Sequence, residues 1–394
     1  MKRLAIIGSV GIPVNHEGFE TLTENLVEQL SYKYEITVFC STKDLKRSER
    51  KSSYKGARLK FIPLKANGLQ GVLYYYIAIF RALFYADTLL ILGVSGCTML
   101  PLVRLFTRKK IIVNIDGLEW RRKKWGRLAK WFLRLSEGFA IRYSHVDVVD
   151  NKAIQRYTTM YYGTVSKVIP YGGNHKTVDR SNEALMNKYP FVNNDYFIKV
   201  APIEPENNIE LILRTFSVEK EQLVIVGDWS KSEFGKALYK EYGSLSNIQL
   251  LNPIYELEEI DFLRGNAKAY IHGREAGGTN PSLVQAMCLG LPVISFNVSF
   301  NRETTKAQAL YFGSENELKA IIKTTLEKEY IKNKKAMLLI SHKEYTWKRI
   351  AEQYDDLIEW LRFEYAHKMN VPKLGELDRI RLRSGDFEQI IAKH

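Results

Sequence analysis

The residue types best suited to holding an anion lie close together between positions 270 and 295. An apolar run ends at His272, a loop of small residues follows at 277–282, and Gly290 ends the helical segment before a second apolar run. Backbone N–H groups at the start of a helix attract negative charge. Pro281 suits the first helical position, where an N–H would have had no partner. A ligand-free corner between a strand and a helix would contain the same glycines, so both interpretations stay open.

Residues 277–287 have the sequence GGTNPSLVQAM, and this string resembles the nucleotide-sugar motif of retaining GT-B glycosyltransferases that are family 4-like. The closer similarity is to the rhamnosyltransferase-like branch of capsule and cell-wall polysaccharide synthesis. Further segments at 8–21, 116–122, 170–173 and 204–208 fit the same branch in the same order. The resemblance implies an α/β fold of two facing Rossmann-like domains with parallel sheets, and a nucleoside-diphosphate sugar as the donor. It also implies retention of anomeric configuration, with no cofactor and no metal.

The resemblance further implies which residues hold the donor. The glycine loop of the first domain would approach the donor pyrophosphate, and Gln285 would bond a ribose hydroxyl through its neutral amide. Alternatively, His272 is a strand-end histidine with a satisfied side chain, and Asn301 caps a helix. The implied donor-binding residues are Gly11, His272, Arg274, Gly278, Thr279, Asn280, Ser282, Gln285, Asn301 and Glu303.

The chain departs from the family pattern at five positions, one of which is Asp116, where many relatives carry a histidine. Pro202 and Asn207 stand where relatives carry an arginine and a lysine that clamp the diphosphate. Gly277 and Gln285 stand where relatives carry two glutamates. Arg274, Lys231 or backbone N–H groups would then have to hold the phosphates.

Three carboxylates are candidates for acid–base chemistry. Asp116 and Glu119 follow an apolar run and could orient and deprotonate an acceptor hydroxyl as a general base. Pairing of Glu119 with Arg121 or Arg122 is the alternative. Glu20 lies near the start of the first helix, where it is either a favourable helix-start charge or a partner of the acceptor hydroxyl. We therefore predict Asp116, Glu119 and Glu20 as catalytic residues.

Positive charge is concentrated in the first half of the chain. Residues 1–170 contain 28 Lys and Arg against 13 Asp and Glu, a net charge of +15, whereas the remainder has 30 against 31 and a net charge of −1. This excess of positive charge indicates partners that carry phosphate: nucleic acid, an anionic lipid surface or a lipid-linked pyrophosphate. No nucleic-acid-binding motif is present, so we expect no nucleic acid as a partner.

A basic segment with aromatic residues predicts contact with an anionic membrane surface. Between positions 121 and 134, cations alternate with bulky apolar residues, and we expect one basic helix there. The alternative is a helix with core aromatics and solvated charges. The predicted membrane and acceptor residues are Arg121, Arg122, Lys123, Lys124, Trp125, Lys130 and Trp131.

A chain of 394 residues with 45% hydrophobic content is expected to form two domains. Short apolar runs alternate with helical patterns, which is typical of parallel sheets. We place an acceptor- and membrane-facing domain at 1–172, a nucleotide-sugar domain at 173–343, and a helix and tail at 344–394. The helix at 345–365 either crosses back to the first domain or covers the second. The predicted strands lie at 4–7, 36–39, 59–62, 89–92, 111–115, 146–149, 197–200, 223–226, 248–251, 269–272 and 293–296.

The cysteines, the glycine loop near Gly8 and the N-terminal residues indicate which cofactors and which cellular location to expect. Cys40, Cys97 and Cys288 are widely spaced in apolar surroundings, which favours reduced core thiols over disulfides or a metal site. The glycine loop near Gly8 lacks the full GxGxxG spacing, which disfavours a nicotinamide cofactor. No secretion pattern opens the chain, so we expect a cytoplasmic protein, peripheral on the inner face of the cell membrane.

These patterns predict transfer of a sugar, with a deoxyhexose such as rhamnose as the candidate, from a nucleoside diphosphate to a lipid-linked glycan acceptor in surface polysaccharide synthesis. Two rival hypotheses stay open. One is a catalytically impaired partner protein with the same fold, and the other is a nucleotide-sugar epimerase.

Overall fold

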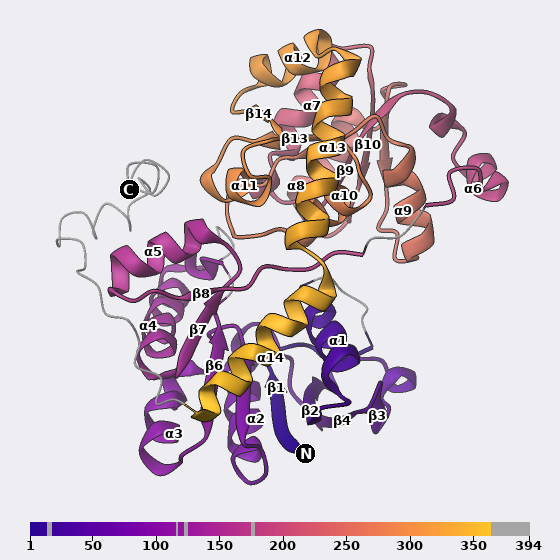
Figure 1. The fold of residues 1–394 in the computed structure, drawn as a ribbon. Coiled ribbons are helices and arrows are strands. Elements are labelled where there is room, and N and C mark those ends of the chain that lie inside the picture. Colours follow the sequence, from indigo (N-terminus) through magenta and orange to yellow (C-terminus); the bar gives the residue numbers. More distant parts are fainter. Residues whose placement is uncertain (14–17, 116, 122–124, 175–177, 364–394) are drawn as a thin grey trace. The chain divides into compact units, whose positions relative to one another are not determined.

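The computed structural model of the protein describes residues 1–13, 18–115, 117–121, 125–174 and 178–363 (Figure 1). The chain forms two compact units. The first contains Met1–Tyr171 and the segment that begins at Trp347, and the second contains Gly172–Thr346. Each unit is a mostly parallel sheet covered by helices, so the predicted α/β class is confirmed.

The sheet of the first unit has the strand order β3-β4-β2-β1-β5-β6-β7-β8, with only β3 antiparallel to its neighbour. The strand β5 (Thr88–Leu92) is buried along its whole length, as expected for a central parallel strand with helices on both faces. All six strands predicted in this half are present. The other elements are β1 (Lys2–Ile7), β2 (Tyr34–Ser41), β3 (Ser53–Tyr54), β4 (Ala57–Ile62), β6 (Lys110–Asn114), β7 (Val146–Val149) and β8 (Lys167–Val168), with α1 (Phe19–Leu30), α2 (Leu69–Leu83), α3 (Leu100–Phe106), α4 (Arg127–Tyr143) and α5 (Lys152–Tyr162).

The helix α14 (Trp347–Phe363) returns to the first unit and packs against α1. Its apolar stripe, which includes Ile350 and Tyr354, is buried. Asn114 Nδ2 donates to the Tyr354 hydroxyl at 2.8 Å, which joins the helix to the end of β6. On its other side, the Tyr34 hydroxyl donates to Asp355 at 2.5 Å. The predicted crossing helix is therefore confirmed, and the alternative of a helix on the second domain is wrong.

The sheet of the second unit is fully parallel, with the order β11-β10-β9-β12-β13-β14. All five strands predicted in this half are present. The strands are β9 (Tyr196–Val200), β10 (Gln222–Val226), β11 (Ile248–Leu251), β12 (Ala269–His272), β13 (Val293–Phe296) and β14 (Leu310–Phe312). The helices are α6 (Glu183–Lys188), α7 (Ile209–Ser217), α8 (Glu233–Tyr242), α9 (Leu257–Asn266), α10 (Pro281–Cys288), α11 (Ser299–Thr304), α12 (Glu315–Thr324) and α13 (Glu327–Glu344).

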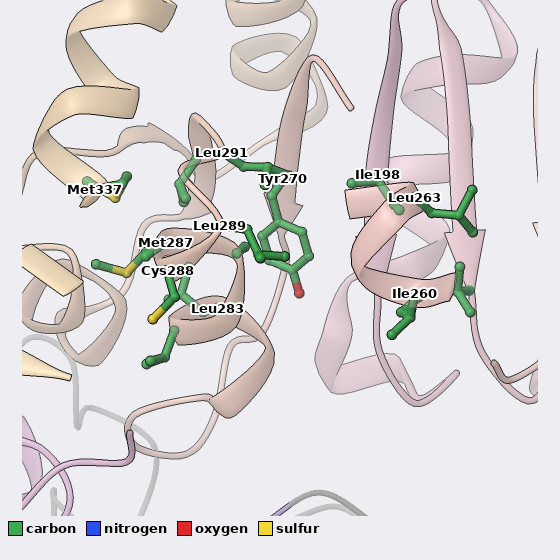
Figure 2. Close-up of a cluster of buried hydrophobic side chains, with 14 of the residues drawn as sticks. Ile198, Ile260, Leu263, Tyr270, Leu283, Met287, Cys288, Leu289, Leu291 and Met337 are labelled. Atoms are coloured by element: carbon green, nitrogen blue, oxygen red, sulfur yellow. The ribbon is translucent and has the colours of Figure 1, made fainter. Parts of the chain in front are cut away.

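Two apolar clusters, one on each face, hold this sheet. Alternate residues of each strand point to opposite faces. Ile198 and Tyr270 therefore pack with Leu283 and Met337 from α10 and α13 (Figure 2). Their strand neighbours, such as Ile271, pack with α7, α8 and α12. Because both faces are closed by core, polar side chains on these strands are confined to the strand ends.

The substitution Tyr354→Phe tests how α14 is held. It removes a buried hydroxyl that accepts a hydrogen bond from Asn114, and it should lower the free energy of unfolding by about 1–2 kcal/mol. Calorimetric unfolding would measure this change. Tyr32→Phe, at a hydroxyl-bearing side chain that is 79% exposed in the same unit, is the control and should change it little. Equal effects of the two substitutions would contradict the assigned role.

Candidate functional site

The central strands of the second unit bring two loops together. β9 and β12 are parallel neighbours, so the loops that follow them leave the same edge of the sheet. Glu275 N–H donates to the Glu206 carbonyl at 2.9 Å, and Asn208 Nδ2 donates to the Gly273 carbonyl at 2.7 Å. The carboxyl edge of a parallel sheet is where α/β domains bind ligands. The loops at 201–208 and 273–280 therefore form one candidate site.

The backbone N–H groups in the first turn of α10 form hydrogen bonds within the protein. The helix begins at Pro281, as predicted, and Asn280 is its N-cap. Asn280 Oδ1 accepts from the N–H groups of Ser282 at 2.9 Å and Leu283 at 3.3 Å. The N–H of Val284 donates to the Asn280 carbonyl at 3.0 Å, and Pro281 has no N–H. The expectation that this helix start offers open N–H groups is therefore wrong, and an anion here needs the preceding loop and basic side chains.

Ser282, predicted to contact the donor, belongs to a buried network. Its hydroxyl accepts from Arg264 Nη2 at 3.0 Å, lies 2.9 Å from the Tyr270 hydroxyl and donates to the Val200 carbonyl at 3.0 Å. Arg264 is itself paired with Asp261 at 3.3 Å. A serine hydroxyl has one proton and two lone pairs, and all are used here. Ser282 therefore fixes the start of α10 against β9 and β12.

The loop before α10 is shaped by Arg274 and a glycine. Arg274 Nε donates to the Ala276 carbonyl at 2.7 Å, which folds the guanidinium over the backbone. Gly277 has φ of 133°, and a Cβ there would lie 3.0 Å from Arg274 Nε. Glycine is required because side-chain-bearing residues rarely adopt this φ. Gly278 is partly exposed in this loop, and Thr279 beside it is buried.

Gln285 binds the backbone of Asn174, near the start of the second unit. Its Nε2 donates to the Asn174 carbonyl at 3.2 Å, and its Oε1 accepts from the Asn174 N–H at 3.0 Å. These reciprocal bonds use the amide that was expected to meet a ribose hydroxyl. The predicted ribose contact stays a prediction, and it requires Gln285 to exchange these bonds.

Asn301 and Glu303 follow β13 on α11. Asn301 Nδ2 donates to the Arg274 carbonyl at 2.9 Å, which ties α11 to the loop before α10. Glu303 pairs at 2.8 Å with Lys306, which follows the end of the helix. Their predicted contacts with a donor stay predictions.

Two buried basic side chains lie at the ends of the central strands. Lys199 on β9 is 1% exposed, and His272 at the end of β12 is 3% exposed. Burial, with the positive charge of Arg274 nearby, lowers the pKa of Lys199 to about 7. Burial and the charges of Lys199 and Arg274 lower the pKa of His272 well below its ordinary value. Sequence reasoning missed Lys199, although a lysine inside an apolar strand is unusual enough to indicate it.

The amine of Lys199 lies where the second loop begins. A Cβ on Gly273 would lie 3.1 Å from Lys199 Nζ, 3.0 Å from Ile212 Cδ1 and only 2.3 Å from the Asn207 carbonyl oxygen. Gly273 thus makes room for the amine beside the turn before α7. Among the described residues, no carboxylate contributes to the pKa of Lys199 or His272. His272 Nε2 is buried there without a hydrogen-bond partner.

In the first unit, contacts within the protein explain why the loop after β1 contains glycine. Gly11 has φ of 135°, and a Cβ there would lie 2.7 Å from Leu45 Cδ1 and 2.8 Å from Cys40 Sγ. Glu20, in the first turn of α1, accepts from the Val10 N–H at 2.7 Å and holds the loop to the helix. The predicted contacts of Gly11 with the donor and of Glu20 with the acceptor stay predictions.

Four of the predicted site residues lie outside the described residues: Asp116, Arg122, Lys123 and Lys124. Glu119 begins a short 3₁₀ turn that ends at Arg121, and its Oε1 accepts from Trp125 Nε1 at 2.9 Å. This bond holds the Glu119 carboxylate beside the indole.

The prediction of one basic helix from 121 to 134 is wrong. α4 begins only at Arg127, after Gly126 with an extended backbone at φ −70° and ψ 167°. Arg121 lies on the preceding 3₁₀ turn, and Trp125 lies between the two elements. Of the predicted membrane residues, Lys130 and Trp131 are on the helix.

α4 carries a second buried titratable group. Glu137 is 1% exposed and accepts from the hydroxyls of Tyr157 and Tyr162, both at 2.7 Å. Burial raises its pKa to about 7. Beside it, the Arg134 guanidinium lies 4.3 Å from the Trp120 ring centroid. These contacts join α4 to α5 and to the 3₁₀ turn.

Cys40, Cys97 and Cys288 are free and buried, as expected for core thiols, and burial raises the pKa of Cys40 and Cys288 to about 12. In the part of the chain that the structure describes, no group of three or more His, Cys, Asp or Glu is placed to hold a metal ion. Across the same residues, no helix combines the length and apolar character needed to cross a bilayer.

Comparison with protein families covers both halves of the chain. Residues 181–338 match the model of glycosyl transferases group 1, and residues 1–174 match a domain of unknown function, DUF1972. No curated protein matches the chain by sequence. The candidate site thus lies in the part of the chain that is similar to the group 1 glycosyltransferases, and the part before it is similar to DUF1972.

Solved structures share the fold over nearly the whole chain. Sucrose-phosphate synthase from Thermosynechococcus elongatus is similar with a TM-score of 0.74 at 15% identity, covering 92% of this chain and 99% of that one. HepE from Anabaena, solved with UDP-glucose, gives 0.69 at 15% identity, with 91% and 100% covered. The α,α-trehalose 6-phosphate synthase from Burkholderia multivorans gives 0.68 at 8% identity, with 92% and 97% covered. These similarities establish the GT-B fold, as predicted.

Replacing Lys199 tests how much its burial lowers the stability of the folded protein. The unfolded chain binds a proton at this group up to about pH 10.5, whereas the folded protein loses it near pH 7. Wild-type stability should therefore rise with pH between these values. Lys199→Met should raise Tm by about 5 °C at pH 6, and the gain should disappear toward pH 10. Lys268→Met, at a partly exposed lysine paired with Asp195, is the control. Calorimetry without ligand measures both, and a gain that is constant with pH would contradict the assignment.

Proposed function

We propose that this protein transfers a sugar from a nucleoside-diphosphate sugar to a hydroxyl of a lipid-linked glycan. The proposal is carried by one observation: the loop of Arg274 and the buried Lys199 converge at the carboxyl edge of a domain that matches the group 1 glycosyltransferases. Basic side chains and loop amides at that edge would stabilise the leaving diphosphate by preorganised charge. The transfer would retain the anomeric configuration without a metal ion.

The proposed donor sugar is a deoxyhexose such as rhamnose, and the proposed process is surface polysaccharide synthesis, as for a capsule or O-antigen. The support is the similarity of GGTNPSLVQAM at 277–287 to the rhamnosyltransferase-like branch. A nucleotide-sugar donor is further supported by HepE, which has the same fold and was solved with UDP-glucose.

We assign acceptor binding to the first domain. Glu20, Asp116 and Glu119 are proposed to orient and deprotonate the acceptor hydroxyl. Glu20 and Glu119 accept hydrogen bonds from Val10 N–H and Trp125 Nε1, which fix their carboxylates in place.

A surface on the first domain supports a lipid-linked acceptor and a peripheral place on the cytoplasmic face of a membrane. α3 and α4 pack together and expose Leu102, Leu105, Phe106, Leu128, Trp131 and Leu135, a set that we call the α3–α4 face. α3 has no acidic residue, and the only one on α4, Glu137, is buried. Arg104 and Arg127 on the same helices are exposed. Exposed apolar side chains among cations, without exposed carboxylates, suit an anionic lipid surface.

The rival is a catalytically impaired protein with the same fold. Pro202 in place of a phosphate-clamping arginine and the engagement of Gln285 by Asn174 favour it. Release of free nucleoside diphosphate from any of a panel of nucleotide sugars would support the transferase over this rival.

Thermal shift with UDP, dTDP, GDP and their sugars tests the donor site. At least one should raise the Tm of the wild type, by several degrees at about 100 times its Kd. Asn280→Asp keeps a good N-cap but places a carboxylate beside the phosphates, so it should at least halve that shift while leaving the ligand-free Tm nearly unchanged.

The matched control is Asn182→Asp, because Asn182 caps α6 in the same way, by accepting from the Leu185 N–H at 3.1 Å. This variant should respond to nucleotides as the wild type does. If no nucleotide shifts the wild type, the donor assignment fails.

Cosedimentation with vesicles tests the α3–α4 face. The triple variant Leu105→Glu, Phe106→Glu and Trp131→Glu should reduce binding to vesicles that contain anionic lipid by at least about tenfold, because three exposed apolar side chains that would enter the lipid are lost and negative charge is added. Leu339→Glu, at a leucine that is 71% exposed on α13, is the control and should bind as the wild type does. Unchanged binding of the triple variant would exclude this face.

A further inference from the structure

We infer that Lys199 is an additional phosphate-binding element of the donor site, and that it takes up a proton from solvent as the diphosphate binds. The inference rests on the proposed function, because it concerns the ligand of the same site. It assigns a role to a residue inside a β-strand, outside both loops.

The loops themselves supply little positive charge. Residues 201–208 contain no lysine or arginine, and residues 273–280 contain only Arg274. The amides of the first turn of α10 are used by Asn280 and cannot replace missing cations. Two phosphates carry more negative charge than one guanidinium neutralises. The buried amine of Lys199, at the end of β9, lies next to these loops and can supply further positive charge.

The position of Lys199 suits this role. Its Nζ lies next to Gly273, the first residue of the loop, at a point where a Cβ would be 3.1 Å away. Isolated charge is costly to bury, so a buried lysine is normally paired with a carboxylate. A bound phosphate would supply the counter-charge that the described residues do not give Lys199.

The surrounding charges leave Lys199 free to gain a proton. Of the charged groups on the elements packed around it, only Arg274 shifts the pKa of Lys199, and it acts with burial to lower that pKa to about 7. An anion would raise the pKa again, so an amine that is neutral at pH 8 becomes an ammonium ion by taking one proton from solvent. The charged and titratable groups on these elements are Glu204 and Glu206 on the turn before α7, Glu210 and Arg214 on α7, Asp228 after β10, and His272, Arg274 and Glu275 at the end of β12.

Titration calorimetry at pH 8.0, in two buffers of different ionisation enthalpy, tests the inference. The probe is whichever of UDP, dTDP and GDP gives the largest thermal shift. At this pH the terminal phosphate is already ionised, since its second pKa is about 6, so proton uptake reports on the protein. The wild type should take up most of one proton. Lys199→Met and Lys199→Gln should take up none and bind roughly tenfold or more weakly.

Lys268→Met is the matched control and should bind with the affinity and proton uptake of the wild type. If both Lys199 variants keep the affinity or the proton uptake of the wild type, the inference is overturned while the proposed function stands. If the wild type binds none of the three nucleotides, both fall. Loss of binding in Lys199→Met together with a lower ligand-free Tm at pH 6 would indicate misfolding and would also overturn the inference, because the buried charge is expected to cost stability.

Discussion

The parallel pairing of β9 with β12 is the constraint on which the candidate site depends. These strands are separated by two β-α units in the sequence but are neighbours at the centre of the second sheet. Their carboxyl ends therefore meet, and the loops that follow them are joined by backbone and side-chain hydrogen bonds. Apolar clusters close both faces of the sheet, so ligand-binding groups are left to this edge.

At that edge, the N–H groups of the first turn of α10 are used within the protein, whereas the buried amine of Lys199 has no carboxylate partner among the described residues. Asn280 satisfies α10, and the Ser282 hydroxyl is enclosed by Arg264, Tyr270 and Val200. Lys199 is the opposite case, since it is buried without a described counter-charge and lowers stability as long as no anion is bound. A residue that costs stability in the empty protein and improves binding is a common feature of functional sites.

In the first domain, several carboxylates serve as hydrogen-bond acceptors within the fold. Asp355 and Glu359 on α14 bond to Tyr34, and the buried Glu137 on α4 bonds to Tyr157 and Tyr162. Because Glu137 is the single acidic residue of α3 and α4, the α3–α4 face presents apolar and basic side chains. This matches the excess of positive charge in the first 170 residues.

The sequence by itself determined the elements whose signals are local. Apolar runs with intervening helical patterns located all eleven predicted strands, and Pro281 and Gly290 located the two ends of α10, because strand burial, N1 proline and a left-handed C-terminal glycine act within a few residues. The stripe around Tyr354 predicted a helix, but its partner on the first sheet remained one of two alternatives.

Only the tertiary structure decided which side chains meet. The engagement of Gln285 depends on Asn174, more than a hundred positions earlier. Lys199 looked like one residue of an apolar strand, and its proximity to His272 and Gly273 follows from the pairing of β9 with β12. Hydrogen bonds and electrostatic shifts act through space over a few ångströms, so residues distant in the sequence acquire them only when the sheet forms.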